Sequence, residues 1–107
     1  MKPLLPSLKE KKRYVVFEVI GQPGRIRVAD LIMASASRLL GELGMARANI
    51  YVMNEKWDSG TRKGVLRVNR KYVEHAKAAL ALVDEGLVMR AVGVSGTLKK
   101  AMGKFMG

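Results

Sequence analysis

The chain has 107 residues, 49% of them hydrophobic and 27% charged, which suits a single globular domain and excludes a disordered segment. Twenty Lys and Arg against nine Asp and Glu give a net charge of +11, and a field of that sign attracts polyanions, nucleic acid first among them. The absence of cysteine excludes disulfides and thiolate zinc sites. Because no secretory signal and no membrane-spanning apolar run is visible either, we expect a cytoplasmic protein.

Two prolines and a basic run mark the first part of the chain, and we interpret residues 1–12 as an arm that precedes the domain. The following stretch, RYVVFEVIG, is rich in β-branched and aromatic residues, which predicts a strand. Because side chains alternate across a strand, Val15, Phe17 and Val19 share one fully apolar face, which we expect to be the core side. Glu18 lies on the other face, where an arginine of a neighbouring strand can pair with it.

Periodicity divides the remaining residues into further helices and strands. A proline-containing connection follows the first strand, and glycines or polar turns separate the later elements. Gly44 is expected to cap the end of the first helix, and Asn69 the start of the second. The predicted elements are a helix over 28–44, strands over 48–54 and 63–69, a helix over 70–84, a strand over 87–94 and a short basic helix within 95–107.

The order β-α-β-β-α-β predicts an α+β fold of the ferredoxin-like (RRM-like) kind. This is a four-stranded antiparallel sheet with two helices on one face, here with short helices at the termini. We assign residues 13–94 to this domain and residues 95–107 to a basic helix packed on or beside it. The second face of the sheet is expected to be open, and many RNA-recognition domains bind RNA on such a face.

Side chains that could form a catalytic site are sparse. His75 falls inside the second predicted helix without a second histidine or a cysteine to complete a metal site, so we interpret it as an ordinary surface or boundary residue. Asp84 and Glu85 are adjacent at a helix end, where they suit the turn better than acid–base chemistry. The chain has no phosphate-binding loop, dinucleotide motif or Ser-His-Asp set. We therefore expect no catalytic residue, no metal site and no cofactor bound by this chain.

The predicted sheet is poorly supplied with aromatic residues for stacking RNA bases. The third strand, KGVLRVN, has none, and Tyr14 and Phe17 of the first strand point to opposite faces. Recognition of shape and phosphates by lysine and arginine therefore suits the residues better.

Basic residues fall into three clusters along the chain. Taken singly, each could be a solvated surface, but three together on a chain of charge +11 favour phosphate binding. The Ser95-Gly96-Thr97 turn before the tail helix offers backbone N–H groups and hydroxyls to a phosphate, and its alternative interpretation is a plain N-cap. The clusters are Lys9, Lys11, Lys12 and Arg13; Arg62, Lys63, Arg67, Arg70 and Lys71; and Lys99, Lys100 and Lys104.

The tail also has an amphipathic pattern, with Leu98, Met102 and Phe105 on one helical face. Such a helix can lie on an anionic membrane, but three apolar residues are few for stable interfacial binding. The same residues could instead close the edge of the core, and RNA remains the preferred partner.

Three segments carry a resemblance to a known family: KKRYVVFEVI at the first strand, LLGELG at the helix end, and RAVGVSGTLKK at the last strand and its exit. They resemble the family of protein component 2 of archaeal ribonuclease P, the counterpart of the eukaryotic Pop-five subunit. The similarity covers residues 9–101, and GVSGTLK is its most specific part.

The resemblance implies the same ferredoxin-like fold and a function as a protein subunit of ribonuclease P. In that particle the catalytic RNA, with Mg²⁺, removes the 5′ leader of precursor tRNA, so cleavage would be metal-assisted chemistry carried by RNA. The implied partners are ribonuclease P RNA, precursor tRNA, a TIM-barrel-like protein subunit and other subunits of the particle. Carried over by position, the RNA contacts are Lys11, Lys12, Arg13, Ser95, Gly96, Thr97 and Lys99; charge alone adds Arg67, Arg70, Lys71, Lys100 and Lys104.

Two other functions fit the same residues. A generic basic RNA-binding or ribosome-associated module would bind RNA with the same salt sensitivity, without stimulating precursor-tRNA cleavage. A small ferredoxin-like enzyme or ligand-binding regulator would need a pocket with convergent polar groups. A protein partner would need an apolar patch, for which the candidates are Leu40, Met45, Tyr51, Met53 and Trp57.

Overall fold

The predicted helices and strands of the domain are all found in the computed structural model, which describes residues 11–21, 27–83 and 86–106. A further helix follows the last strand, and two short 3-10 turns, η1 and η2, lie before β3 and α2. The elements are β1 (Lys12–Gly21), α1 (Val28–Ala48), β2 (Tyr51–Val52), η1 (Asn54–Lys56), β3 (Lys63–Asn69), η2 (Arg70–Tyr72), α2 (Val73–Ala81), β4 (Leu87–Ser95) and α3 (Leu98–Phe105).

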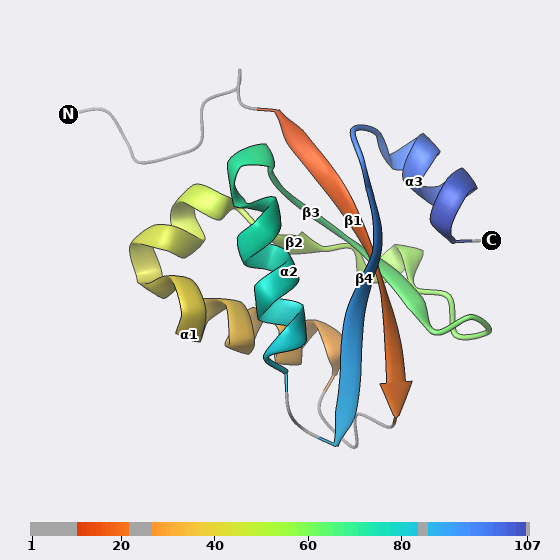
Figure 1. Ribbon diagram of the computed structural model, residues 1–107, viewed down its shortest axis with the longest axis horizontal. Coiled ribbons are helices and arrows are strands. Elements are labelled where there is room, and N and C mark those ends of the chain that lie inside the picture. The colour runs from red at the N-terminus through yellow and green to blue at the C-terminus, as the bar shows by residue number, and fades with distance from the viewer. Residues whose placement is uncertain (1–10, 22–26, 84–85, 107) are drawn as a thin grey trace.

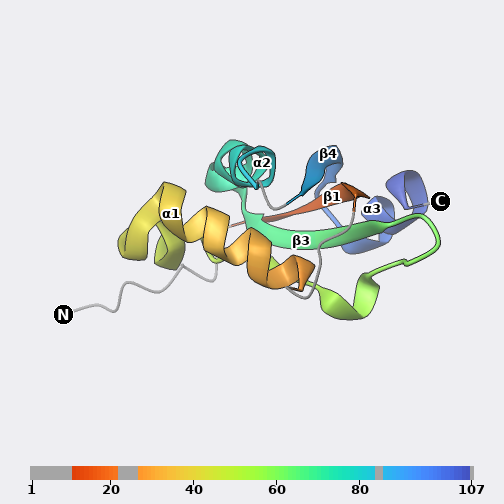
Figure 2. The same cartoon turned by 90° about the horizontal axis from the view of Figure 1, so that it is seen from below.

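The four strands form one antiparallel sheet in the order β2-β3-β1-β4. Helices α1 and α2 lie together on one side of this sheet, while α3 lies on the other (Figure 1, Figure 2). This order is that of two interleaved split βαβ units. The predicted ferredoxin-like α+β fold is therefore confirmed.

The main core lies between the sheet and the pair α1 and α2, and we call this side of the sheet the helix face. Val15, Phe17 and Val19 are buried there, as the alternation of the first strand predicts. Burying a large apolar side chain contributes about 1.5–3 kcal/mol, so this layer supplies most of the apolar stabilisation. Opposite the strands, α1 and α2 contribute Leu31, Ile32, Ala36, Ala76, Ala79 and Leu80.

The second side of the sheet, which we call the α3 face, is not open, and the prediction that it would be is wrong. Val16 and Val65, a cross-strand pair, are fully buried because α3 packs over them. Gly93 makes room for this helix: a Cβ at that position would overlap the Phe105 ring. The predicted apolar face of the tail helix, with Leu98, Met102 and Phe105, is the face that packs here.

Helix α1 continues beyond its predicted end. Gly44 lies inside the helix, and the left-handed cap is Asn49 (φ 51°), whose N–H donates to the carbonyl of Met45. A kink interrupts the helix at Gly41, which has a positive φ of 70°. Glycine adopts this conformation without steric cost, so the chain bends at the first glycine of GELG and then resumes helical geometry.

The second strand is shorter than predicted, because η1 turns the chain away from the sheet directly after Met53. The N–H of Met53 still donates to the carbonyl of Val65 at 2.9 Å. Only Tyr51 and Val52 pair with β3 as a strand. At the start of β3, Lys63 is paired instead with Asp58, through backbone hydrogen bonds of 2.9 and 3.3 Å.

Two local predictions are confirmed. The side chain of Asn69 accepts a hydrogen bond from the N–H of Lys71 at 3.1 Å, capping the η2 turn that leads into α2. Glu18 pairs with Arg90 of β4, with Oε1 and Nε 2.9 Å apart. Asp84 and Glu85, which we assigned to the turn after the second helix, lie outside the described residues. No helix in the described part of the chain is long and apolar enough to cross a bilayer.

Candidate nucleic-acid interface

Parts of all three basic clusters of the sequence meet at one end of the sheet, which we call the basic end. Antiparallel pairing places the start of β1 beside the ends of β3 and β4, because Lys12 is opposite Asn69 and Tyr14 is opposite Ser95. The N–H of Arg70 donates to the carbonyl of Lys11 at 2.9 Å, and this hydrogen bond holds residues 11–13 beside residues 67–71. Segments 11–13, 67–71 and 95–100 are thus neighbours, and none of them contains an acidic residue.

The Ser95-Gly96-Thr97 turn lies against the first cluster. A Cβ built on Gly96 would be 3.9 Å from Nη1 of Arg13, whose Nη1 also donates to the carbonyl of Lys12 at 3.0 Å. Arg13 is half-buried and Gly96 is exposed. The arginine therefore stands at the junction of β1 with the β4–α3 turn, where an incoming phosphate would meet both.

The same turn caps α3. Thr97 Oγ1 accepts from the N–H of Lys100 at 3.2 Å, and Ser95 Oγ accepts from the N–H of Thr97 at 3.4 Å. The N-cap interpretation of the turn is therefore confirmed for Thr97. Phosphate binding at the turn stays a prediction, and it would rely on the neighbouring lysines more than on the Thr97 hydroxyl.

Three lysines of α3 surround a shallow hollow beside the basic end. Lys99, Lys100 and Lys104 are all exposed and line this hollow of about 640 Å³ together with Ser95. Phe105 also lines it. A concave basic surface of this kind suits a run of phosphates, because several positive charges approach the same stretch of backbone.

One row of residues crosses all four strands on the α3 face. Tyr51, Arg67, Tyr14 and Ser95 are successive cross-strand partners in this row. The Arg67 guanidinium lies over the Tyr51 ring, 5.4 Å from its centre, and its buried Nε has no hydrogen-bond partner within the described residues. Arg67 is therefore packed against an aromatic ring, unlike the freely exposed Arg70 and Lys71.

The second cluster of the sequence divides between two ends of the sheet. Lys63 lies opposite Glu18, at the far end of β3, and its Nζ donates to the carbonyl of Phe105 at 3.1 Å. Arg62 donates from Nε to the carbonyl of Val19 at 3.3 Å and from Nη2 to that of Gly21. These two cations hold the fold together and do not belong to the basic end. Lys9 lies outside the described residues.

Arg47 is a basic residue near this end that the sequence clusters did not include. It is exposed in the last turn of α1, and its carbonyl accepts from Nδ2 of Asn69 at 3.5 Å. Its position beside the start of η2 comes from helix packing. The sequence did not indicate this position, because the predicted helix ended at Gly44, before Arg47.

The acidic residues and the histidine of the described chain lie outside the three segments of the basic end. His75 is exposed with its ring 5.1 Å from that of Tyr72, so its interpretation as a surface residue is confirmed. Within residues 11–21, 27–83 and 86–106, no three of His, Cys, Asp and Glu gather where they could hold a metal ion. The pKa of Asp58 is lowered, first by the hydrogen bond from the Gly60 N–H and then by the Thr61 hydroxyl, which is the chemistry of a surface turn.

The candidate residues for a protein-binding patch are only partly available. Tyr51 and Trp57 are 46% and 37% exposed. Leu40 and Met45 pack against the helix-face core, and Met53 against the cluster under α3. The exposed members therefore lie around β2 and η1, at one edge of the sheet.

The fold and the basic end define a class: a small, basic, ferredoxin-like protein with cations from three chain segments at one end of its sheet. A family model, the Rpp14/Pop5 family, matches residues 13–106. The chain belongs to the Rpp14/Pop5 family.

Relatives of known name are similar over nearly the whole chain. A protein named Ribonuclease P protein component 2 from Pyrococcus abyssi is 39% identical, over 99% of this chain and 93% of its own length. The protein of the same name from Methanosarcina acetivorans is 37% identical, over 99% of this chain and 82% of its own. In the cryo-EM structure of yeast Ribonuclease MRP, one chain superposes with a TM-score of 0.56 at 12% identity, covering 86% of this chain and 79% of that one. That likeness concerns the fold alone.

Proposed function

We propose that this chain is a protein subunit of ribonuclease P, which binds the catalytic RNA and supports it in removing the 5′ leader of precursor tRNA. The names of the relatives support this assignment, as does membership of the family. The observation that carries it is the meeting of three cation-bearing, acid-free segments at one end of the sheet. The chain is then part of an enzyme, a tRNA-processing endonuclease, without contributing catalytic side chains.

The basic end acts by neutralising phosphates. Folded RNA brings phosphates close together, and lysine and arginine side chains replace the counterions that would otherwise have to condense there. With about five such contacts, the slope of log affinity against log salt is about −3 to −5. Mg²⁺ supplies the metal-assisted cleavage in the RNA, and the residues of this chain bind and position RNA around it.

The partners follow from the same assignment. They are ribonuclease P RNA, precursor tRNA, a TIM-barrel-like protein subunit and other subunits of the particle, and the particle works in the cytoplasm.

Reconstitution tests the proposal. Precursor tRNA is incubated with the cognate ribonuclease P RNA at limiting Mg²⁺, with and without this chain and its TIM-barrel-like partner. The complete mixture is expected to cut at the 5′ leader junction, and omission of this chain is expected to abolish the gain. An active mixture that loses nothing on omission would contradict the proposal and leave the generic RNA-binding module.

A further inference from the structure

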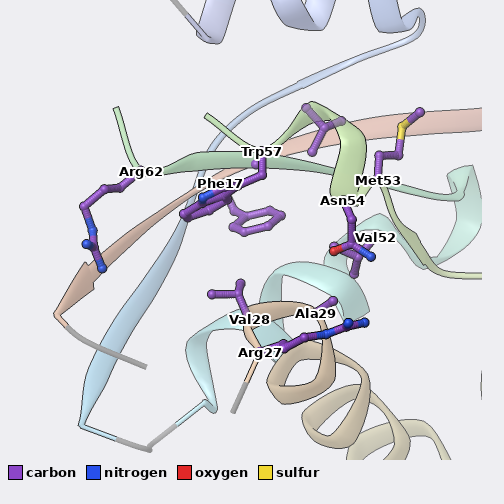
Figure 3. Close-up of a pocket in the computed structure, with 11 residues that line it drawn as sticks. Phe17, Arg27, Val28, Ala29, Val52, Met53, Asn54, Trp57 and Arg62 are labelled. Carbon is purple, nitrogen blue, oxygen red and sulfur yellow. The ribbon is translucent and has the colours of Figure 1, made fainter. Parts of the chain in front are cut away.

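A cavity of about 480 Å³ opens at the β2 edge of the sheet, away from the basic end. Figure 3 shows the rings of Phe17 and Trp57 on one side of it, and Val28 and Ala29 from the start of α1 on the other. A volume of this size is in the range of small-ligand sites. Along β1, Phe17 is five residues from Lys12, or about 17 Å at the rise of a strand.

The shortness of β2 creates this cavity. After Met53 the chain leaves the sheet through η1 and rejoins the edge of β3 at Asp58, which bridges Lys63, so Trp57 lies in a segment that does not pair with β3. A Cβ on Gly64 would lie 2.6 Å from Cζ of Phe17. The Phe17 ring therefore lies directly against the backbone of Gly64, and both residues line the cavity.

The cavity has an aromatic wall that is both fixed and accessible. Phe17 is 1% exposed and packed in the core. Trp57 packs beside it, with ring centres 6.4 Å apart and planes inclined by 32°, but 37% of Trp57 remains exposed. A large indole supported from behind and open in front can stack a planar ring, and stacking of bases on such rings tolerates any base.

The polar residues around the cavity are neutral or positively charged. Arg27, with a side chain 75% exposed, stands at the start of α1, where its Nε lies 3.7 Å from Oδ2 of Asp30 in an exposed ion pair that a phosphate would have to displace. Asn54 presents an exposed amide from η1. No carboxylate is among the described lining residues. An aromatic wall, an amide and a cation match the ring, the polar edge and the phosphate of a nucleotide. An apolar side chain of a protein would contact the aromatic wall but would form no hydrogen bond with the amide and no ion pair with the cation.

We propose that this cavity binds one unpaired nucleobase of an RNA strand whose neighbouring phosphates reach toward the basic end. Trp57 stacks the base, Asn54 faces its polar edge and Arg27 contacts an adjacent phosphate. The inference takes from the proposed function only that the partner is RNA. It adds a base-binding site to a surface otherwise suited to phosphates alone.

The fluorescence of Trp57 tests this directly, because it is the only tryptophan of the chain. The full-length protein is titrated with a single-stranded oligoadenylate and with an abasic oligonucleotide of the same length. Oligoadenylate is expected to quench the emission saturably. The abasic strand is expected to bind through its phosphates, detected by anisotropy of a 5′ dye, without quenching.

Substitutions give a second measurement. Trp57→Ala is expected to weaken oligoadenylate binding about tenfold, a typical effect of losing one stacked base, and to leave abasic binding unchanged. Trp57→Phe, which keeps an aromatic ring, is expected to retain most of the affinity. Leu82→Ala removes another exposed apolar side chain, 56% exposed and outside the cavity, and is expected to change neither affinity nor thermal unfolding.

The outcomes separate this inference from the proposed function. Equal quenching by both strands, or none by either, overturns the base site, even if reconstituted cleavage remains dependent on the chain. If the TIM-barrel-like subunit alone alters Trp57 emission and prevents quenching by oligoadenylate, the occupant is protein and the base site is wrong. Loss of all RNA binding by the unaltered protein would overturn the proposed function itself.

Discussion

The two faces of the sheet are covered by very different amounts of protein. On the helix face, two helices bury one continuous core that includes residues of every strand. On the α3 face, one helix of eight residues packs on the sheet, and the buried cluster there has only four members, Val16 and Val65 from the strands with Ala101 and Met106 from the helix and its C-cap. The exposed lysines of α3 and the Tyr51–Arg67–Tyr14–Ser95 row belong to this second face.

This difference separates stability from recognition. The buried residues of the helix face are mostly apolar. Ser35 is a buried polar residue there, and its hydroxyl donates to the carbonyl of Ala79 at 2.6 Å. Apolar burial there sets the free energy of unfolding. The α3 face combines a modest apolar contact with cations at its rim. Changes on the first face should therefore alter stability, and changes on the second should alter RNA binding or the attachment of α3.

The largest expected effect comes from one matched substitution on each face. Leu66→Ala, at a fully buried position on the helix face, is expected to cost about 3 kcal/mol of unfolding free energy through lost burial and the remaining cavity. Leu98→Ala makes the same change at a half-buried position of α3 and is expected to cost about 1 kcal/mol. Urea unfolding measures both values, and equal losses would contradict the contrast between the faces.

Gly93→Ala should break the α3 face while sparing the other. A methyl group there overlaps the Phe105 ring, so α3 must shift, at a cost of about 1–3 kcal/mol. Hydrogen exchange is expected to accelerate at the Ala101 N–H, which donates to the Thr97 carbonyl at 3.1 Å, and to stay slow in α2.

Gly103→Ala is the control for that substitution. Gly103 lies in the same helix, and a Cβ there meets nothing within 4 Å. Because alanine favours helix over glycine by about 1 kcal/mol, α3 is expected to become more protected from exchange. Faster exchange in both variants would show that the Gly93–Phe105 contact is not the cause.

A smaller effect, on binding alone, is expected at the rim of the α3 face. Lys99→Ala with Lys100→Ala removes two exposed charges and is expected to leave unfolding unchanged. The double variant should weaken RNA binding about tenfold and reduce the salt slope by about 1.5, as expected for two lost phosphate contacts. Arg38→Ala with Lys56→Ala removes the same charge from α1 and η1, and its salt slope is expected to be unaltered. Unchanged RNA affinity in the lysine variant would remove the tail from the interface.

The smallest expected effect concerns the turn beyond η1. Hydrogen bonds from Gly60 first and Thr61 second lower the pKa of Asp58 in the folded state. Stability from this carboxylate is therefore present above its unfolded pKa, about 3.9, and is lost as pH falls through the folded value. The unfolding free energy of the native chain and of Asp58→Asn is measured between about pH 5 and pH 2, where the carboxylate titrates. The free energy of the native chain is expected to fall more steeply with decreasing pH than that of the variant. Parallel plots of unfolding free energy against pH would show that protonation of Asp58 does not affect stability.

Much of the fold was predictable because periodicity reports burial. Alternation identified Val15, Phe17 and Val19 as core residues, and all three are buried on the helix face. Boundaries were less predictable. Gly41 and Gly44 have the same side chain, and only the backbone conformation, positive φ at the first, distinguishes a kink from a helical position.

The sequence by itself determined the order of elements, the apolar faces, the positive charge and the family, because each of these is carried by neighbouring residues. The tertiary structure decided what lies together. Antiparallel pairing brought segments 11–13, 67–71 and 95–100 to one end and sent Lys63 to the other. Packing placed α3 over Val16, and a two-residue β2 left the cavity beside Trp57. Such juxtapositions depend on contacts between residues far apart in the chain, and no local pattern encodes them.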